Sequence, residues 1–331
     1  MAATLPLWAA ELSAAAELAG NDVAAGLALA ESYGGQLPAP GDGETCVRWT
    51  LLSLVAERDL SAARILEAHS DALAILHEAG EHSPSGTWGV FAAEARGVRL
   101  EAVEHRNDVA LTGTKPWCSL AGSLDHALVT AHIGNERCLY AVDLNSESIT
   151  VEPPTRWVAR GLTNITSAAV HFAGTPARAI GDPGWYLRRA GFAWGGMGVA
   201  ACWYGGANGL YRSLRSASAV PPGPLVALHI GIVDAALHGA GAALRQAADF
   251  VDAGAARGSA GELLALRVRA VVADAVERTI RQVGHALGPA PLAFDEKHAR
   301  RVADLELYVR QYHAERDLAA LGAAVSGDDR E

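Results

Sequence analysis

Hydrophobic positions recur along the chain with two periods, and the changes between these periods divide it into three parts. Through about residue 80, Ala and Leu recur with helical spacing, and WAAELSAAAELAGNDVAAGLALAESY predicts one or two helices. The loop ESYGGQLPAPGDGET follows and is punctuated by Gly and Pro. From Glu44 the pattern predicts a further helical pair, whose apolar stripe includes Leu60, Ile65, Leu66 and Leu73.

The period shortens at HSPSGTWG, and from there to about Asp182 the chain contains short β-like runs. These runs include TWGVFAAEA, VRLEAVEHR, VALTGTK, HALVTAHI and RCLYAVDL, and turn residues separate them. Alternation is regular in VRLEAVEH, which is typical of a strand with one face packed and the other in water. Short strands with turn signals at these intervals predict a small antiparallel β domain.

Helical spacing returns after Gly184 and continues to the end of the chain. A Pro-Pro-Gly-Pro break at residues 221–224 precedes a long predicted helix ending at Gly254, and two more predicted helices follow. The fold class is therefore α+β with segregated parts. We expect an N-terminal helical domain at 1–84, a central antiparallel β domain at 85–183 and a C-terminal four-helix-type bundle at 184–331.

Composition narrows the functional classes. Half of the 331 residues are hydrophobic, 19% are charged and the net charge is -10, so we expect a globular protein without a nucleic-acid groove. The four cysteines are scattered with no Cys-x-x-Cys pair, which favours a reducing cytoplasm and no cysteine metal site. The N-terminus lacks a basic leader, and no uncharged apolar stretch is long enough to predict a membrane span.

Two local patterns have an ordinary structural interpretation. The segment from Gly196 to Ala201 fits G-x-G-x-x-A, but its flanks are helical and no strand precedes it, so close helix packing is the better interpretation. His313 and Asp317 lie four residues apart on a predicted helix and could form a charge-assisted pair, although a solvated helix face is the simpler explanation. Metalloprotease, P-loop and nucleophile-elbow motifs are absent from the sequence.

One string is more specific. LTGTKPWCSLAG at residues 111–122 has the pattern LTGTK-x-W-x-[ST], and R-G followed by A-x-V-x-F occupies residues 160–172 before a GDPG turn. In this order, after a helical lead-in, the motifs resemble those of the acyl-CoA dehydrogenase family from about Ala56 to Leu321. The resemblance implies FAD bound between the β domain and the C-terminal bundle, in a homotetramer or a dimer of dimers.

The resemblance assigns roles to particular positions. Trp117 corresponds to the aromatic residue that packs against the flavin ring, and Ser119 to the hydroxyl that bonds the N5 edge of the flavin. These roles suit a flat ring with a π face and an N5 atom tuned by a hydrogen-bond donor. Cys118 would point to the other side of the strand and into the core. Gln282 matches the Gln that contacts the ADP part of a neighbouring subunit's FAD.

Further cofactor positions depart from the family pattern. The segment FAAE, with Phe91, Ala93 and Glu94, replaces the Thr-Glu-Pro segment whose backbone borders the flavin pyrimidine. His229 stands where the family has a Gln at the cofactor. The Arg and Phe-Gly that hold the FAD pyrophosphate are replaced by SASAVPPGPL, which removes a bidentate charged contact.

The catalytic position differs as well. Arg310 stands at the place of the family's catalytic Glu, and the alternative position near Gly195 has no carboxylate either. An Arg side chain stays protonated and cannot accept the α-proton of a thioester. One hypothesis is therefore a subunit of a heteromeric enzyme that desaturates acyl-CoA thioesters of lipid or steroid type. A homologous partner would supply the Glu, and an electron-transfer flavoprotein would accept the electrons.

Three alternatives stay open. The chain could be a flavin monooxygenase of the same fold that uses His313 and Ser119. It could be a degenerate, non-catalytic paralogue kept for assembly, as a homo-oligomer or with a partner. It could also be an ordinary dehydrogenase whose base is Glu306 or Glu315.

Overall fold

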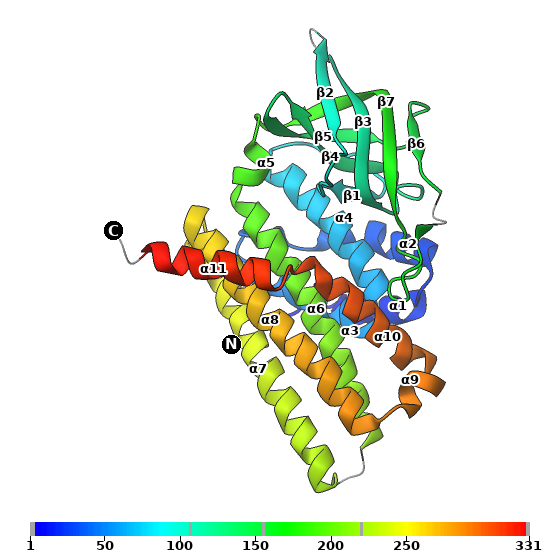
Figure 1. Ribbon diagram of the computed structural model, residues 1–331, viewed down its shortest axis with the longest axis vertical. Coiled ribbons are helices and arrows are strands. Elements are labelled where there is room, and N and C mark those ends of the chain that lie inside the picture. Colours follow the sequence, from blue (N-terminus) through cyan, green and yellow to red (C-terminus); the bar gives the residue numbers. More distant parts are fainter. Residues whose placement is uncertain (1–3, 106–107, 154–155, 219–220, 329–331) are drawn as a thin grey trace.

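The computed structural model describes residues 4–105, 108–153, 156–218 and 221–328, and it places a β-barrel at one end of a body of helices (Figure 1). The predicted α+β class is confirmed. Helices in the N-terminal part are α1 (Ala9–Ala19), α2 (Val23–Tyr33), α3 (Thr45–Arg58) and α4 (Leu60–Glu78). The single stretch WAAELSAAAELAGNDVAAGLALAESY therefore forms two helices, α1 and α2.

Aspartate side chains mark two of these helix starts. Asp22 accepts a hydrogen bond from the Ala25 N–H at 3.0 Å, and Asp59 accepts one from the Ala62 N–H at 2.9 Å. Each satisfies a backbone donor that a helix start leaves without a partner. Helix α4 then runs beneath the barrel and packs against its first strand (Figure 1).

The strands are β1 (Trp88–Phe91), β2 (Leu100–His105), β3 (Asp108–Ser119), β4 (His126–Ile133), β5 (Glu136–Asp143), β6 (Ile149–Val151) and β7 (Ser167–Ile180). Strands β4, β2, β3, β7 and β5 pair in that order, and β5 pairs back to β4, which closes a barrel. The prediction of a purely antiparallel domain was wrong in part, because β1 and β2 pair with β4 in parallel. The remaining pairings are antiparallel.

The helices after the barrel are α5 (Trp185–Arg188), α6 (Ala190–Ala217), α7 (Pro224–Asp252), α8 (Gly258–Leu287), α9 (Ala290–Phe294), α10 (Glu296–Tyr308) and α11 (Glu315–Asp328). Helix α6 is central and packs against α3, α8 and α4 (Figure 1). The C-terminal stretch predicted as one helix is interrupted after Tyr308 by a short 3-10 turn. His313 consequently lies in the linker before α11. The sequence pattern had placed it on a helix, and that prediction was wrong.

Glycines let α6 lie close to its neighbours. Gly198 lies against the indole of Trp49 on α3, and a Cβ at Gly205 would overlap the carbonyl oxygen of Ser53. The G-x-G-x-x-A string is therefore a helix-packing feature inside α6, as expected. The domain limits predicted from the sequence stay a prediction, since α3 and α4 pack directly on α6.

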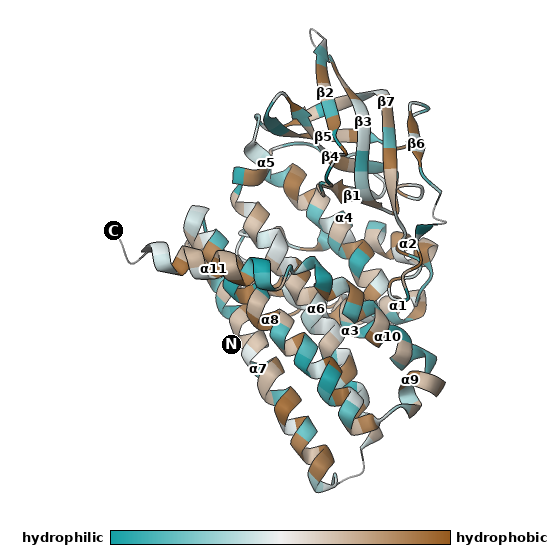
Figure 2. Cartoon of the chain, viewed as in Figure 1, coloured by the Kyte–Doolittle hydropathy of each residue, from teal (hydrophilic) through white to brown (hydrophobic). Residues whose placement is uncertain are grey.

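Helix α7 is a long helix with apolar residues exposed on its surface. Figure 2 shows hydrophobic residues along it, and Leu225, Leu228 and Phe250 are exposed. Among the described helices, α7 alone is long and apolar enough to cross a membrane, by length and composition only. Core helices of soluble proteins meet the same criterion, and α7 packs lengthwise on α8.

Candidate functional site

Strand β3 departs from regular geometry at its end. Its register against β7 shifts between Lys115 and Cys118, and Trp117 has a φ angle of 59°. A bulky residue rarely adopts a positive φ, because its Cβ crowds the backbone. The indole of Trp117 is 61% exposed, whereas Cys118 is fully buried, and burial raises the pKa of that thiol to about 12. The strand therefore holds a large aromatic side chain in solvent at a conformational cost.

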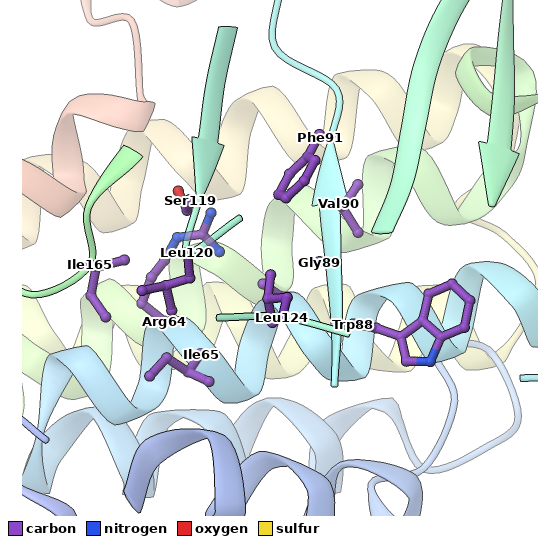
Figure 3. A pocket seen from close by; sticks show the side chains of 11 residues that line it. Arg64, Ile65, Trp88, Gly89, Val90, Phe91, Ser119, Leu120, Leu124 and Ile165 are labelled. Atoms are coloured by element: carbon purple, nitrogen blue, oxygen red, sulfur yellow. The ribbon is translucent and has the colours of Figure 1, made fainter. Parts of the chain in front are cut away.

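Ser119 lies at the end of the same strand. Its Oγ is 2.7 Å from the Oγ of Ser167 on β7, so the two hydroxyls share a hydrogen bond. The Ser119 side chain also lines a small cavity of about 20 Å³ between β1, β3 and α4. Figure 3 shows Arg64 reaching from α4 toward Ser119 and Leu120, with Phe91 on the other side of the cavity. A cavity of this size has room for about one water molecule.

Arg64 belongs to a polar cluster buried among α4, α6 and α10. Its Nη1 donates to Glu67 Oε2 at 2.7 Å, and the hydroxyl of Tyr308 donates to the same oxygen at 3.3 Å. Burial raises the pKa of Glu67 despite the nearby Arg64 charge, and burial together with Cys202 and Glu67 raises the pKa of Tyr308. These side chains fill the interior next to the Ser119 cavity.

A second guanidinium extends this filled interior. Arg269 on α8 lies 4.8 Å from the centre of the Trp203 ring. Its nitrogens donate to the carbonyl oxygens of Gly196 at 2.9 Å and Gln311 at 2.8 Å. The space between α6, α8 and α10 is thus occupied in part by this guanidinium and the Trp203 ring.

The FAAE segment follows β1. Phe91 is buried at the Ser119 cavity, and Ala93 is exposed. The Glu94 carboxylate accepts a hydrogen bond from Nζ of the buried Lys115 at 2.6 Å, and Arg137 lies 3.4 Å away. Burial would raise the pKa of Glu94, but the bond from Lys115 and these cations lower it overall. The Glu94 carboxylate is therefore a structural ion-pair partner.

His229 and Gln282 contact each other directly. Nδ1 of His229 is 2.7 Å from Oε1 of Gln282, which joins α7 to α8. The pair lies near the end of these helices that points away from the barrel (Figure 1). The structure therefore brings these two predicted cofactor residues together, but places them far from Trp117 and Ser119 within one chain.

The two candidate catalytic positions lie at the surface. Arg310 pairs with Glu277 of α8, and both side chains are about half exposed. The Nδ1 atom of His313 is 3.3 Å from Oδ1 of Asp317, and Asp317 also accepts a hydrogen bond from the His313 N–H at 3.1 Å. The predicted His313–Asp317 contact is thus present, and it caps the start of α11.

Sequence reasoning missed Arg64 and Ser167. Arg64 immediately precedes Ile65 and Leu66 and stands three residues before Glu67, a spacing that brings two side chains together on a helix. That spacing was the available signal for a buried pair. Ser167 has no local signal, because only the pairing of β3 with β7 brings it to Ser119.

Comparison with known proteins depends on structure alone, since no protein-family model and no curated protein matches the sequence. TdsC from Paenibacillus sp. A11-2, a dibenzothiophene monooxygenase crystallised with FMN, gives a TM-score of 0.79 at 16% identity over 95% of each chain. Butyryl-CoA dehydrogenase from Megasphaera elsdenii gives 0.79 at 14% identity over 98% of this chain and 100% of that chain. The chain has the acyl-CoA dehydrogenase fold. Methanesulfinate monooxygenase MsuC from Pseudomonas fluorescens gives 0.75 at 18% identity over 95% of this chain and 94% of that chain.

The acyl-CoA dehydrogenase fold is thus shared by proteins with different reactions, and likeness at these identities establishes the fold only. A flavin can be tested against the residues present. Trp117 offers an exposed ring face, and Ser119 offers a hydroxyl two residues away on the same strand. Both features fit a flat heterocycle with a polar edge.

Proposed function

We propose that this protein is a flavin-dependent oxidoreductase, with the flavin ring stacked on Trp117 and its edge at Ser119. The observation that carries the proposal is the exposed indole of Trp117, held at a positive φ beside a partly buried hydroxyl. An aromatic side chain kept in solvent at such a cost is expected where it covers a ligand.

Each residue would have a definite task. A bound flavin would supply the capacity to accept a hydride or to react with oxygen. Trp117 would cover one face of the ring and exclude water from it. Ser119 would donate its proton to the ring edge while its oxygen accepts from Ser167, because a hydroxyl can donate one hydrogen bond and accept two.

The more specific form of the proposal is a subunit of a heteromeric enzyme that desaturates acyl-CoA thioesters, with the Glu base supplied by a homologous partner. Arg310 supports this form, because a guanidinium paired with Glu277 cannot take a proton. The interior filled by Arg64, Glu67 and Tyr308 also leaves a cavity of only about 20 Å³ beside Ser119, which is too small for an acyl chain.

Two surface features support a partner. Helix α7 exposes Leu225, Leu228 and Phe250, which suits burial against another subunit. The His229–Gln282 pair lies far from the chain's own Trp117, where it could instead contact a cofactor held by a neighbour. We place this assembly in the cytoplasm, in keeping with four cysteines that are all free thiols.

A flavin monooxygenase is the second candidate. The missing pyrophosphate Arg favours it, because FMN carries a single phosphate and has no pyrophosphate for such an Arg to hold. His313, with its ring about half exposed beside Asp317, and Ser119 would then be the residues that move protons. His313→Ala would abolish flavin-dependent oxygenation while leaving flavin bound, and unchanged turnover would remove His313 from this role.

Flavin binding by the purified chain tests the proposal. The protein is titrated separately with FAD and FMN and followed by visible absorbance and flavin fluorescence. Trp117→Ala should weaken binding at least tenfold through the lost ring contact, whereas Phe294→Ala, which removes a fully solvated aromatic, should not. Preference for FMN supports the monooxygenase, and preference for FAD supports the dehydrogenase subunit.

The partner is tested by co-expression with a Glu-bearing homologue encoded beside this gene. Co-purification and thioester-dependent flavin reduction by the pair, but not by either chain alone, are the expected results for a heteromer. Absence of flavin from the chain, both alone and in the presence of that homologue, would contradict the proposed function.

A further inference from the structure

A second, separate cavity lies along the same face of helix α4 that carries Arg64. Residues 64, 68, 71, 74 and 78 are spaced by three or four, so they lie in one row on the helix. The first two line the small Ser119 cavity, and the other three line a separate cavity of about 190 Å³. At about 30 Å³ per water molecule, this cavity could hold about six waters, or one small organic molecule.

Four segments build its wall. Asp71 and Glu78 come from α4, Arg189 and Trp194 from the start of α6, Gly41 from the loop before α3, and Arg257 from the turn before α8. Gly41 has a φ of 89°, and a Cβ there would lie 2.8 Å from the Trp194 ring. The loop can therefore close over the indole only with glycine at this position.

Hydrogen bonds hold this wall in place. The Gly41 N–H donates to Thr45 Oγ1 at 2.9 Å, and the Thr45 hydroxyl donates to Asp252 at the end of α7 at 2.5 Å. Nε1 of Trp194 donates to the Ala256 carbonyl at 2.7 Å, one residue before Arg257. The cavity is thus bordered by segments that are tied to one another, as expected of a preformed binding site.

Part of the charge in the cavity is already paired. Glu78 accepts a hydrogen bond from Arg189 Nη1 at 2.7 Å and another from the Gly191 N–H at 3.1 Å. Asp42 and His77 lie 3.1 Å apart at the outer side. These groups have partners within the protein and call for no ligand.

Two groups in the cavity have no such partner. Asp71 makes no hydrogen bond or ion pair with any described residue, although its charge acts on the buried Arg48. Arg257 lies against Trp194, 5.8 Å from the ring centre, and none of the described carboxylates pairs with it. Arg189 is not such a group, because its Nη1 is bonded to Glu78 and its Nε is buried away from the cavity.

Gly195 packs closely against Asp71, since a Cβ there would lie 3.1 Å from Asp71 Oδ1. One carboxylate without a partner and one guanidinium without a partner carboxylate thus line one small cavity. Their complement is a molecule with one ammonium group and one anionic group.

We propose that this cavity binds a small zwitterion of the size of an amino acid, with its ammonium at Asp71 and its anionic group at Arg257. This site goes beyond the proposed flavin reaction and needs no flavin to be occupied. A thioester of coenzyme A does not match it, because such a molecule brings several negative charges and no compact ammonium.

The test is direct binding to the purified full chain, followed by calorimetry and by thermal unfolding. L-leucine is compared with isoamylamine, which lacks its carboxylate, and with 4-methylpentanoate, which lacks its ammonium. Glycine and γ-aminobutyrate vary the size and the separation of the charges. At least one zwitterion should bind one to one and at least tenfold more tightly than either of the two single-charge compounds.

Variants test which residue binds the ammonium and which binds the anionic group of the zwitterion. Asp71→Asn should weaken zwitterion binding about tenfold or more and leave 4-methylpentanoate unchanged, and Arg257→Gln should do the same while leaving isoamylamine unchanged. Glu262→Gln and Arg267→Gln, at exposed positions on α8, are the matched controls and should bind as wild type. The proposal is overturned if no zwitterion binds more tightly than its single-charge analogues, or if both cavity variants bind as the controls do. The flavin titration is read separately, so failure of one proposal does not imply failure of the other.

Discussion

The backbone N–H of Trp88, the first residue of β1, donates a hydrogen bond to Nδ1 of His69 on α4 at 3.1 Å. Because Nδ1 accepts this bond, the neutral ring carries its proton on Nε2. The side chain is buried, and burial lowers the pKa of His69 to about 4. A neutral histidine therefore joins the barrel to the helix that carries both cavities.

This contact predicts a pH dependence of stability. The folded-state pKa of His69 lies below the ordinary value of 6.5, so the unfolded chain binds more protons between pH 6.5 and 4. The contribution of His69 is complete above about pH 6.5 and is lost as the pH falls, by about 2–3 kcal/mol in the free energy of unfolding. Urea unfolding of His69→Gln should lack this loss, whereas the exposed His238→Gln should keep it.

The carboxyl group of Asp304 predicts a pH dependence of stability that is opposite to that of His69. Its Oδ1 accepts a hydrogen bond from the Leu162 N–H at 2.5 Å, and burial raises the pKa of this carboxyl to about 6. The folded state therefore holds the proton more tightly, and stability is lost as the pH rises from about 4 to 6. Asp304→Asn keeps an acceptor and cannot ionise, so it should gain about 1–3 kcal/mol relative to wild type between pH 4 and pH 7.

His69 and Asp304 change the free energy of unfolding in opposite directions as the pH rises. The pH dependence measured for wild type alone therefore does not separate the two contributions. The informative quantity is the difference in unfolding free energy between wild type and each variant across this pH range. A difference that does not change with pH would show that the Asp304 carboxyl titrates as an ordinary surface group.

The Arg64–Glu67 pair predicts a cost for breaking a buried ion pair. Arg64→Met removes the cationic partner of the Glu67 carboxylate, leaving only the Tyr308 hydroxyl, and should lower the free energy of unfolding by about 3–5 kcal/mol. The double variant Arg64→Met/Glu67→Leu should recover much of that loss, since no buried charge remains. Denaturant unfolding of the single and double variants measures this, and additive losses would contradict it.

The matched control for the Arg64 and Glu67 variants is the exposed ion pair of Arg278 and Asp274, which are 2.9 Å apart on α8. Both side chains are largely in solvent, so removing either one should change the free energy of unfolding by less than about 1 kcal/mol.

Gly161 predicts a steric requirement where the chain after β6 meets α10. A Cβ at this position would overlap the carbonyl oxygen of Ala303, which is part of the helix backbone and cannot rotate away. Gly161→Ala should therefore lower the free energy of unfolding by more than about 2 kcal/mol. Gly322→Ala on α11, where a Cβ meets nothing within 4 Å, should be neutral or slightly stabilising.

Much of the fold follows from local patterns. Long Ala- and Leu-rich segments predicted the order of helices, and alternation predicted the strands, because one buried face imposes a period that the sequence must carry. The parallel pairing of β1 with β4 could not be predicted, since it depends on where α4 delivers the chain. The interruption at His313 was missed because the hydrophobic spacing continues across it.

The site was predictable only in part. Trp117 and Ser119 were proposed because a motif in one strand places them together, and their role at a cofactor stays a prediction. The contact of Ser119 with Ser167 spans two strands that lie 48 residues apart in the sequence. Arg64 was missed because a cation within an apolar stripe is normally assigned to solvent, and only packing against Tyr308 shows that it is inside. The His229–Gln282 contact likewise required the register of α7 against α8.

The closure of the barrel by the β4–β5 pairing has a consequence for association between chains. A closed ring of strands has few unpaired backbone groups to which a strand from another molecule could add. The strands outside the ring, β1 (Trp88–Phe91) and β6 (Ile149–Val151), are short, and α4 packs against β1. Intermolecular strand addition is therefore disfavoured, and any association between chains is expected to use the helices.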